Sequence, residues 1–170
     1  MRLRFSEIPT TGSRYALKGF ASADSWDGVA VKNLLAAECL LKRKAEDKVE
    51  MRGRVHVIVS LECDRCLAPF DVEINSPLQM LFELASAESW QVKELECKGA
   101  DLDTILLDEP VVDIDDAFRQ HIFLALPVKN LCSEECKGIC PQCGAQRNQD
   151  VCSCSGSRRE SPFSILNSIK

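Results

Sequence analysis

Six of the chain's ten cysteines lie within one short stretch, CSEECKGICPQCGAQRNQDVCSC, which runs from Cys132 to Cys154. Four thiolates around one tetrahedral metal ion require two close pairs, each held by a turn, and a connection long enough to fold back. The segment CPQCG supplies one such pair at Cys140 and Cys143, because proline sets the turn and glycine lets the backbone pass close to a metal-bound sulfur. This part of the chain is therefore expected to fold around a metal ion.

The natural second pair is the CSC segment eight residues further on. The sequence thus predicts one Zn²⁺ site formed by Cys140, Cys143, Cys152 and Cys154. Three uses remain open for Cys132 and Cys136: a second zinc with bridging thiolates, replacement of one of the later cysteines, or a joint site with Cys63 and Cys66. The last two form a C-x-x-C in CDRCLAP, which is half of a metal site or a redox pair.

Other uses of clustered cysteines fit the sequence less well. The first residues, MRLRFSEIPTTGSRY, contain no apolar block, so we expect no secretory signal and a cytoplasmic protein. In that compartment thiols stay reduced, which disfavours a disulfide framework. An iron–sulfur cluster also binds four thiolates, but CPQCG favours zinc. Neither C-x-x-C follows a strand and opens a helix as a thioredoxin-like motif would. The isolated Cys39 and Cys97 are interpreted as ordinary packed or surface thiols.

The sequence carries no pattern of a membrane protein or an enzyme. Its longest apolar run, residues 122–128, is far shorter than the roughly 20 residues that span a bilayer. With two histidines and no catalytic motif, it offers no recognisable nucleophile and base. A zinc ion held by four thiolates has no vacant position for water. We therefore expect a binding or assembly protein whose metal stabilises the fold.

The strongest β pattern is a pair of segments on either side of CDRCLAP. VEMRGRVHVIVSLEC and FDVEINSPLQMLFEL alternate apolar and polar residues and predict a hairpin with Cys63 and Cys66 at its tip. Further short strands are expected at residues 2–6 and 14–20, one across TILLDEPVV, and, less clearly, one at 29–41. Residues 85–103 have no sustained period and predict a loop or an edge strand. The N-terminal strands are expected to join the hairpin in one barrel-like sheet, because a lone hairpin is marginal in water.

One helix is predicted over residues 113–126, where apolar residues recur at helical spacing. Asp113 can cap it, acidic residues occupy its first turn, and Pro127 ends it. His121 is interpreted as a helix residue beside the apolar stripe and His56 as a residue of the solvent face. The terminal SPFSILNSIK predicts a short amphipathic helix that docks on the sheet or binds a partner.

These elements predict an α+β fold. It would be a predominantly antiparallel sheet or partly open barrel with one main helix and a cysteine-rich, zinc-binding C-terminal segment. We expect a β-rich domain over residues 1–128 and a cysteine-rich segment with a tail helix over residues 129–170.

Several of these stretches together resemble the YceD-like family, the large ribosomal RNA subunit accumulation proteins. They are LECDRCLAPFDVEI, DEPVVDIDDAFRQHIFLALPVKNLCSEECKGICPQCG, CSC and SPFSILNSIK, in this order. The resemblance implies a non-catalytic factor for accumulation, processing or assembly of large-subunit (23S) ribosomal RNA. It also implies that some relatives keep the pair at Cys63 and Cys66 while lacking most C-terminal cysteines. That would make a site shared between the two groups less favourable and zinc dispensable to the general activity.

The charge is distributed unevenly around a net charge of −5. Residues 1–54 carry 11 basic and 7 acidic residues, residues 55–128 carry 4 and 15, and residues 129–170 carry 6 and 4. This acidic middle does not fit a uniformly basic RNA-binding surface, so RNA would be met locally or through a basic ribosomal protein. The candidate RNA-binding residues are Lys42, Arg43, Lys44, Arg52, Arg54, Lys129, Lys137, Arg147, Arg158 and Arg159.

Two competing hypotheses from other functional classes remain. One is a thiol redox protein that uses Cys63 and Cys66. The other is a zinc-dependent regulator that binds nucleic acid.

Overall fold

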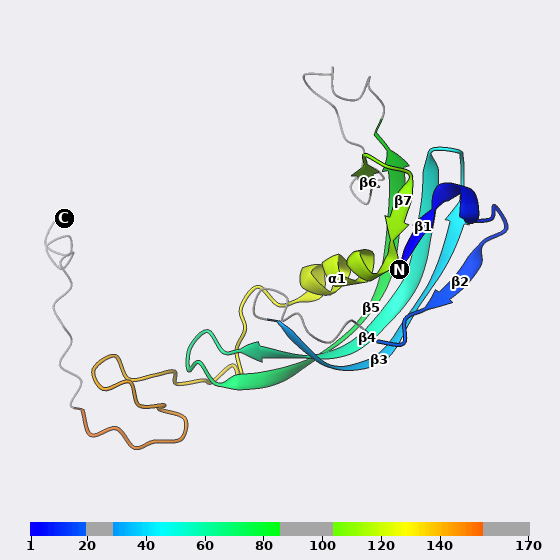
Figure 1. The fold of residues 1–170 in the computed structure, drawn as a ribbon. Helices are drawn as coiled ribbons and strands as arrows, with labels where there is room; N and C mark the ends of the chain where they lie inside the picture. The colour runs from blue at the N-terminus through cyan, green and yellow to red at the C-terminus, as the bar shows by residue number, and fades with distance from the viewer. Residues whose placement is uncertain (20–28, 86–103, 155–170) are drawn as a thin grey trace, which may run out of the picture.

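The computed structural model describes residues 1–19, 29–85 and 104–154. Its elements in chain order are β1 (Arg2–Arg4), the 3-10 helix η1 (Phe5–Glu7), β2 (Ser13–Ala16), β3 (Ala30–Arg43), β4 (Lys48–Glu62), β5 (Pro69–Leu84), β6 (Thr104–Leu107), β7 (Val111–Asp113) and α1 (Ile114–Ala125). Figure 1 shows three long curved strands, with α1 lying across one face of their sheet. The cysteine-rich segment extends from the end of the sheet at the β4–β5 turn.

The main sheet has five strands in the order β2-β3-β4-β5-β6, and β1 and β7 form a separate two-stranded sheet. The predicted hairpin is confirmed, because β4 and β5 pair without interruption from Lys48 with Glu83 to Glu62 with Pro69. Only β6 runs parallel to its neighbour β5; the other described strand pairs are antiparallel. The α+β class is confirmed, and the sheet is not closed into a barrel.

One face of the sheet is apolar and buried beneath α1. Alternate residues of β4, such as Val55, Val57 and Val59, are fully buried, as their period of two predicts. Ile114, Phe118 and Ile122 of α1 are also fully buried and belong to the same core. The sheet and the helix therefore bury their apolar faces against each other, and the opposite face of the sheet carries polar side chains.

The helix begins as its sequence predicts. The carboxylate of Asp113 accepts a hydrogen bond from the backbone N–H of Asp116, so it satisfies one of the unpaired donors of the first turn. The helix ends at Ala125, just before Pro127. In the middle of α1, the Nε2 atom of His121 lies 3.1 Å from Ser76 Oγ on β5, and burial lowers the pKa of the imidazole. This agrees with the prediction of a packed helix residue.

Three details of the strand prediction were wrong. TILLDEPVV contains two strands, because residues 108–110 turn the chain away from β6 and into β7. Phe5 does not continue β1 but opens η1. The N-terminal segments do not share one sheet, since β2 pairs with β3 while β1 pairs with β7. The stretch 86–103, with Cys97, and the tail helix expected near the C-terminus lie outside the described residues.

Candidate metal centres

Eight cysteines form two groups of four. Within each group all sulfur atoms lie within 4.8 Å of one another. The first cluster is Cys63, Cys66, Cys132 and Cys136, and the second cluster is Cys140, Cys143, Cys152 and Cys154. The sulfurs of Cys63 and Cys136 are 3.8 Å apart, and those of Cys143 and Cys152 are 3.5 Å apart. A tetrahedral Zn²⁺ with Zn–S bonds of about 2.3 Å places its sulfurs about 3.8 Å apart, so both clusters fit such an ion.

The second cluster contains the four cysteines that the sequence predicts as one site. The first cluster differs from the expectation drawn from the family resemblance. Cys132 and Cys136 reach the C-x-x-C at the β4–β5 turn, which is the third of the three uses left open by their spacing. Sulfurs of Cys66 and Cys132, 66 residues apart in the chain, lie 3.6 Å from each other.

The two C-x-x-C turns share one backbone pattern. In the first, the N–H of Leu67 donates to the carbonyl of Cys63 at 2.8 Å, and the N–H of Cys63 donates to the carbonyl of Ala68 at 3.0 Å. In the second, Gly144 donates to Cys140 at 2.9 Å, and Cys140 donates to Ala145 at 2.8 Å. CDRCLA and CPQCGA therefore form the same knuckle, in which both sulfurs point to one side of the turn.

The residue after each knuckle has a left-handed backbone conformation, with φ of 75° at Gly144 and 58° at Leu67. This conformation costs a side-chain-bearing residue roughly 1–2 kcal/mol, whereas glycine adopts it freely. We expect Leu67→Gly to raise the free energy of unfolding by about 0.5–1 kcal/mol after the entropic cost of glycine. Leu67→Ala, which retains the backbone strain, should give no such gain in chemical denaturation of the metal-loaded chain. A loss of stability in the glycine variant would contradict this account.

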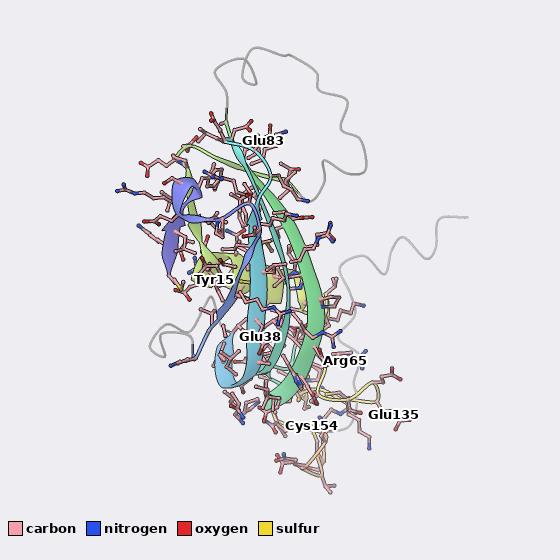
Figure 2. All side chains as sticks on the ribbon, turned by 90° about the vertical axis from the view of Figure 1, so that its right-hand side faces the viewer. Tyr15, Glu38, Arg65, Glu83, Glu135 and Cys154 are labelled. Carbon is pink, nitrogen blue, oxygen red and sulfur yellow. The ribbon has the colours of Figure 1, made fainter. Side chains whose placement is uncertain are left out.

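Side chains of the first knuckle hold the segment that supplies the other two ligands. Asp64 accepts the backbone N–H of Asn130 at 2.8 Å, and its own N–H donates to the Asn130 carbonyl at 2.8 Å. The guanidinium of Arg65 donates to the carbonyls of Glu134 and Cys136 at 3.2 and 3.1 Å. Figure 2 shows Arg65 at the end of the sheet, near the segment that carries Glu135. No role for Asp64 or Arg65 was predicted from the sequence.

The clusters differ in exposure. In the first, Cys63, Cys66 and Cys136 are buried and Cys132 is exposed. In the second, Cys140 is buried, Cys152 is partly buried, and Cys143 and Cys154 are exposed. The first cluster thus lies between the hairpin and the C-terminal segment, while the second lies further out on that segment.

Hydrogen bonds and neighbouring thiols separate the pKa values within each cluster. The backbone N–H of Cys132 contributes most to lowering the pKa of Cys63 to about 6. Cys132 itself has a pKa raised to about 12, chiefly by the thiol of Cys136. In the second cluster, the N–H of Cys143 lowers the pKa of Cys140 to about 6, and Cys152 raises that of Cys154 to about 12. A cation is needed to hold all four sulfurs as thiolates.

Metal binding should therefore release protons. The pKa values of Cys66 and Cys132 in the first cluster, and of Cys152 and Cys154 in the second, are raised above their ordinary value of 9.0. These thiols are protonated near pH 7.5, so each Zn²⁺ should displace at least two protons, and its affinity should increase with pH in this range. Titration calorimetry in buffers with different ionisation heats measures this number. Binding without proton release would exclude thiolate ligation.

The basic residues predicted for RNA binding lie in two places. The main sheet carries Lys42 and Arg43 on β3 and Arg52 and Arg54 on β4, and Lys44 follows β3 directly. Both Lys44 and Arg52 form ion pairs with Glu50, at 2.9 and 2.6 Å. Arg54 forms no ion pair with any other residue that the structure describes.

The remaining predicted basic residues belong to the cysteine-rich segment. Lys129, Lys137 and Arg147 are exposed there. Arg158 and Arg159 lie outside the described residues. Arg14 was not predicted from the sequence. It lies on β2 opposite Leu40, two strands from Arg52, and no sequence signal fixes the register that brings it there.

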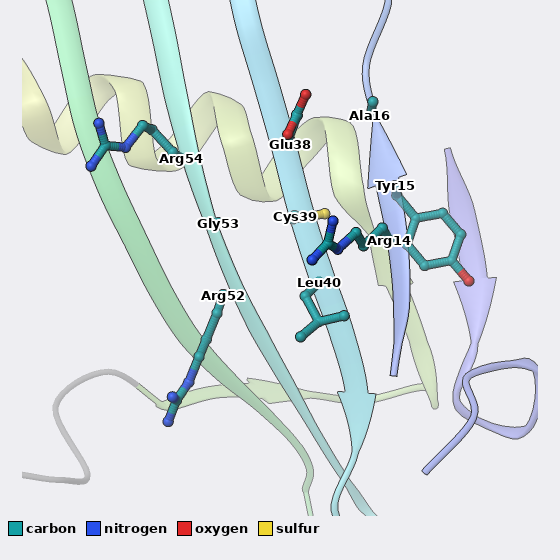
Figure 3. Close-up of a pocket in the computed structure, with 9 residues that line it drawn as sticks. All are labelled: Arg14, Tyr15, Ala16, Glu38, Cys39, Leu40, Arg52, Gly53 and Arg54. Carbon is teal, nitrogen blue, oxygen red and sulfur yellow. The ribbon is translucent and has the colours of Figure 1, made fainter. Parts of the chain in front are cut away.

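A groove of about 500 Å³ lies on the polar face of the sheet. It is lined by residues of β2, β3 and β4, including Arg14, Glu38, Leu40, Arg52 and Arg54 (Figure 3). The strands approach closely here, because a Cβ on Gly53 would lie 2.2 Å from the carbonyl oxygen of Glu38. A side chain at position 53 would therefore push β4 away from β3 at this point of the groove.

Two features stand apart from both clusters. Cys39 is buried in the core, and burial raises its pKa to about 12, which agrees with a packed thiol. His56 lies on the polar face of the sheet, where its Nε2 is 2.6 Å from Glu73 Oε1. No helix of the described ranges is long and apolar enough to cross a membrane.

Comparison with known proteins gives a family for most of the chain. A family model described as "Large ribosomal RNA subunit accumulation protein YceD" matches residues 51–170, which include both clusters. The Arabidopsis thaliana protein "Large ribosomal RNA subunit accumulation protein YCED homolog 1, chloroplastic" is 23% identical over 164 residues, covering 85% of this chain and 50% of the relative.

Bacterial relatives are similar over a shorter range. Uncharacterized proteins of Mycobacterium tuberculosis and Mycobacterium bovis are each 33% identical over 84 residues, covering 49% of this chain and 37% of the relative. The chain thus spans half or less of the length of these curated relatives. No solved structure matches it.

Proposed function

Because this chain belongs to the YceD family of large ribosomal RNA subunit accumulation proteins, we propose that it promotes the accumulation of large-subunit (23S) ribosomal RNA. It would act in the cytoplasm as a non-catalytic processing or assembly factor. The name of the chloroplast relative, which is similar over most of this chain, supports the same role. Its partner would be the ribosomal RNA or a pre-ribosomal particle, met directly or through a basic ribosomal protein.

The observation that carries the non-catalytic part of this proposal is the composition of the two clusters. Each offers four sulfur ligands, the number that a structural Zn²⁺ uses. An ion held in this way has no vacant position for water or substrate, so it supplies only cross-linking of the chain. In the first cluster that link joins the β4–β5 turn to the segment after α1.

Closed thiolate sites also argue against the redox hypothesis. A reactive thiol pair must be available to attack a disulfide, whereas Cys63 and Cys66 are buried and share their site with Cys132 and Cys136. We propose that these two cysteines are metal ligands and that the thiol chemistry of the chain ends with metal binding.

Deletion of the gene, followed by quantification of large- and small-subunit ribosomal RNA and of ribosomal particles on sucrose gradients, tests the proposal. We expect a selective loss of large-subunit RNA that the intact chain restores. Normal RNA levels and a normal particle profile in the deletion strain would overturn the proposed function. A variant with Cys63→Ser and Cys66→Ser separates the hypotheses further. A change in cellular redox response with normal ribosomal RNA would favour a redox protein.

A further inference from the structure

The polar face of the sheet carries a row of positive groups around the groove described above. Arg14 on β2 and Arg52 on β4 are both aligned with Leu40 on β3, so the three side chains form one row across three strands. In the next row, Arg54 lies opposite Glu38. Figure 3 shows Arg14 extending over β3 near Leu40, while Arg52 and Arg54 extend toward β5.

The charge of this groove is only partly neutralised by the protein. Glu50 pairs with both Arg52 and Lys44. Arg14 and Arg54 are exposed and form no ion pair with any residue of the described ranges. Two guanidinium groups are thus available on a chain whose net charge is −5. Guanidinium groups bind phosphate oxygens through paired N–H donors.

The spacing indicates the size of the ligand. Neighbouring strands lie about 4.8 Å apart, so β2 and β4 are separated by about 10 Å. Consecutive phosphates of one nucleic-acid strand advance by about 3.4 Å along the helix axis, so a row of this width can meet more than one phosphate. Tyr15, the one aromatic residue that lines the groove, packs against the core of the sheet, and the row itself presents only Leu40 between its two arginines, so the groove offers no free ring for base stacking. We propose that this groove binds the sugar–phosphate backbone of ribosomal RNA without reading its bases.

This inference rests on the proposed function for the identity of the RNA, and its test is binding by the purified, metal-loaded chain. In vitro transcribed fragments of large-subunit ribosomal RNA would be titrated at several salt concentrations. For the Arg14→Ala/Arg54→Ala variant, we expect weaker binding and a logarithmic salt slope reduced in magnitude by roughly 1.4–1.8, because two phosphate contacts are lost. Substitution of Lys129 and Lys137, the competing RNA-binding candidates of the cysteine-rich segment, by alanine tests the alternative place and should leave the slope unchanged.

Glu38→Gln gives an outcome of opposite sign. Removal of its carboxylate should strengthen RNA binding by about 2- to 5-fold, because the carboxylate repels phosphate. Weaker RNA binding in this variant would overturn the proposal, because the carboxylate would then support RNA binding and not oppose it. An unchanged slope in the arginine variant, or a reduced slope in the lysine variant, would also overturn it by placing RNA elsewhere. The proposed function could still stand in these cases, since it is tested by RNA levels in the deletion strain.

A second inference comes from Asn148, which lies in the loop between the two cysteine pairs of the second cluster. Its amide nitrogen donates to the sulfur of Cys136, a member of the first cluster, at 3.1 Å. Its amide oxygen accepts the backbone N–H of Lys137 at 2.8 Å. One side chain of the second cluster's loop thus fixes both the backbone and a sulfur of the first cluster.

Backbone contacts join the same two regions. The N–H of Ile139 donates to the carbonyl of Arg65 in the first knuckle at 3.1 Å, and the N–H of Arg147 donates to the carbonyl of Gly138 at 2.9 Å. Residue 138 must be glycine, because its φ is 70° and a Cβ would lie 2.9 Å from the Arg65 carbonyl oxygen. Residues 138 and 139 therefore lie between the first knuckle and the loop of the second cluster.

We infer that the two clusters bind metal cooperatively and that Asn148 is the positioning residue that couples them. Closure of the second cluster around its ion orders the loop that carries Asn148, and the ordered amide then stabilises Cys136 as a ligand. Loss of a hydrogen bond to a metal ligand typically lowers metal affinity by 10- to 100-fold. Coupling of this kind is reciprocal, so metal in the first cluster must strengthen the second by the same factor.

Competition of Zn²⁺-loaded chain with a coloured chelator tests this inference without reference to activity. Asn148→Ala should weaken the first cluster by about 10- to 100-fold, whereas Gln149→Ala, at the exposed neighbouring position, should have no effect. Variant Cys152→Ser/Cys154→Ser, which removes the second site, should weaken the first cluster similarly. Adding Asn148→Ala to that variant should then change the Zn²⁺ affinity of the first cluster very little, because the coupling is already lost.

The inference is overturned if the two changes lower the Zn²⁺ affinity of the first cluster additively. It is also overturned if that affinity is unchanged in either variant. Absence of bound metal in the intact chain would instead contradict the zinc part of the proposed function. Cobalt substitution distinguishes a repositioned ligand from a lost one. The thiolate absorption of Co²⁺ in the Asn148→Ala chain should retain tetrahedral four-sulfur character, and loss of that character would show that Asn148 is required for ligation.

Discussion

Replacing Cys63 and Cys66 together by serine is expected to reduce the zinc content from about two ions per chain to about one. It should also release the segment after α1 from the end of the hairpin. The reason is that the first cluster takes two ligands from the β4–β5 turn and two from residues far along the chain. Elemental analysis gives the metal content, and amide hydrogen exchange reports the release as lost protection at Asp64, whose N–H donates to the Asn130 carbonyl.

Cys39→Ala is the matched control for this change. Cys39 is buried in the core and belongs to neither cluster, so its substitution should lower stability while leaving the metal content unchanged. Retention of both ions in the chain without Cys63 and Cys66, with unchanged protection, would show that the hairpin does not take part in metal binding.

Truncation of the helix core should have the largest effect on stability. Phe118 is fully buried between α1 and the sheet, and we expect Phe118→Ala to lower the free energy of unfolding by about 3–5 kcal/mol. Leu124 lies on the same helix with 82% of its surface exposed, so Leu124→Ala should cost under about 0.5 kcal/mol. Urea denaturation of the metal-loaded chain measures both values. Similar losses in the two variants would contradict the packing of α1 on the sheet.

The hairpin and the helix could be predicted because local sequence determines them. The alternating valines of β4 can bury one face only as a strand, and Asp113 with Pro127 limits the helix at both ends. The error at TILLDEPVV has a local explanation as well. Its two strands pair with different and distant partners, β6 with β5 and β7 with β1, and pairing of this kind is not encoded within the segment.

The same difference between local and distant contacts explains which of the two clusters could be predicted. The second cluster is formed by cysteines close in sequence, so the knuckle at Cys140 and Cys143 and the nearby CSC segment were enough to predict its members. The first cluster depends on the path of the chain after α1, which brings Cys132 to Cys66 across 66 residues. No spacing rule covers that distance. Asn148 could not be found from sequence, because its partner Cys136 becomes close only when the loop folds back.

The sheet and α1 do not depend on the metal sites, whereas the cysteine-rich segment does. The core beneath α1 is built from apolar residues of the sheet, the helix and the N-terminal elements, and it contains no ligand of either cluster. The cysteine-rich segment, in contrast, has few buried apolar residues within the described range and depends on its sulfur clusters. Removal of metal should therefore unfold the segment first and leave the sheet and α1 intact.

The central claim, two ions each held by four cysteine sulfurs, is tested most directly by elemental analysis combined with zinc X-ray absorption on the intact chain purified without added metal. The account predicts about two zinc ions per chain, each surrounded by four sulfurs at about 2.3 Å. Iron in place of zinc, nitrogen or oxygen ligands in the first shell, or a metal-free chain with disulfides would contradict it.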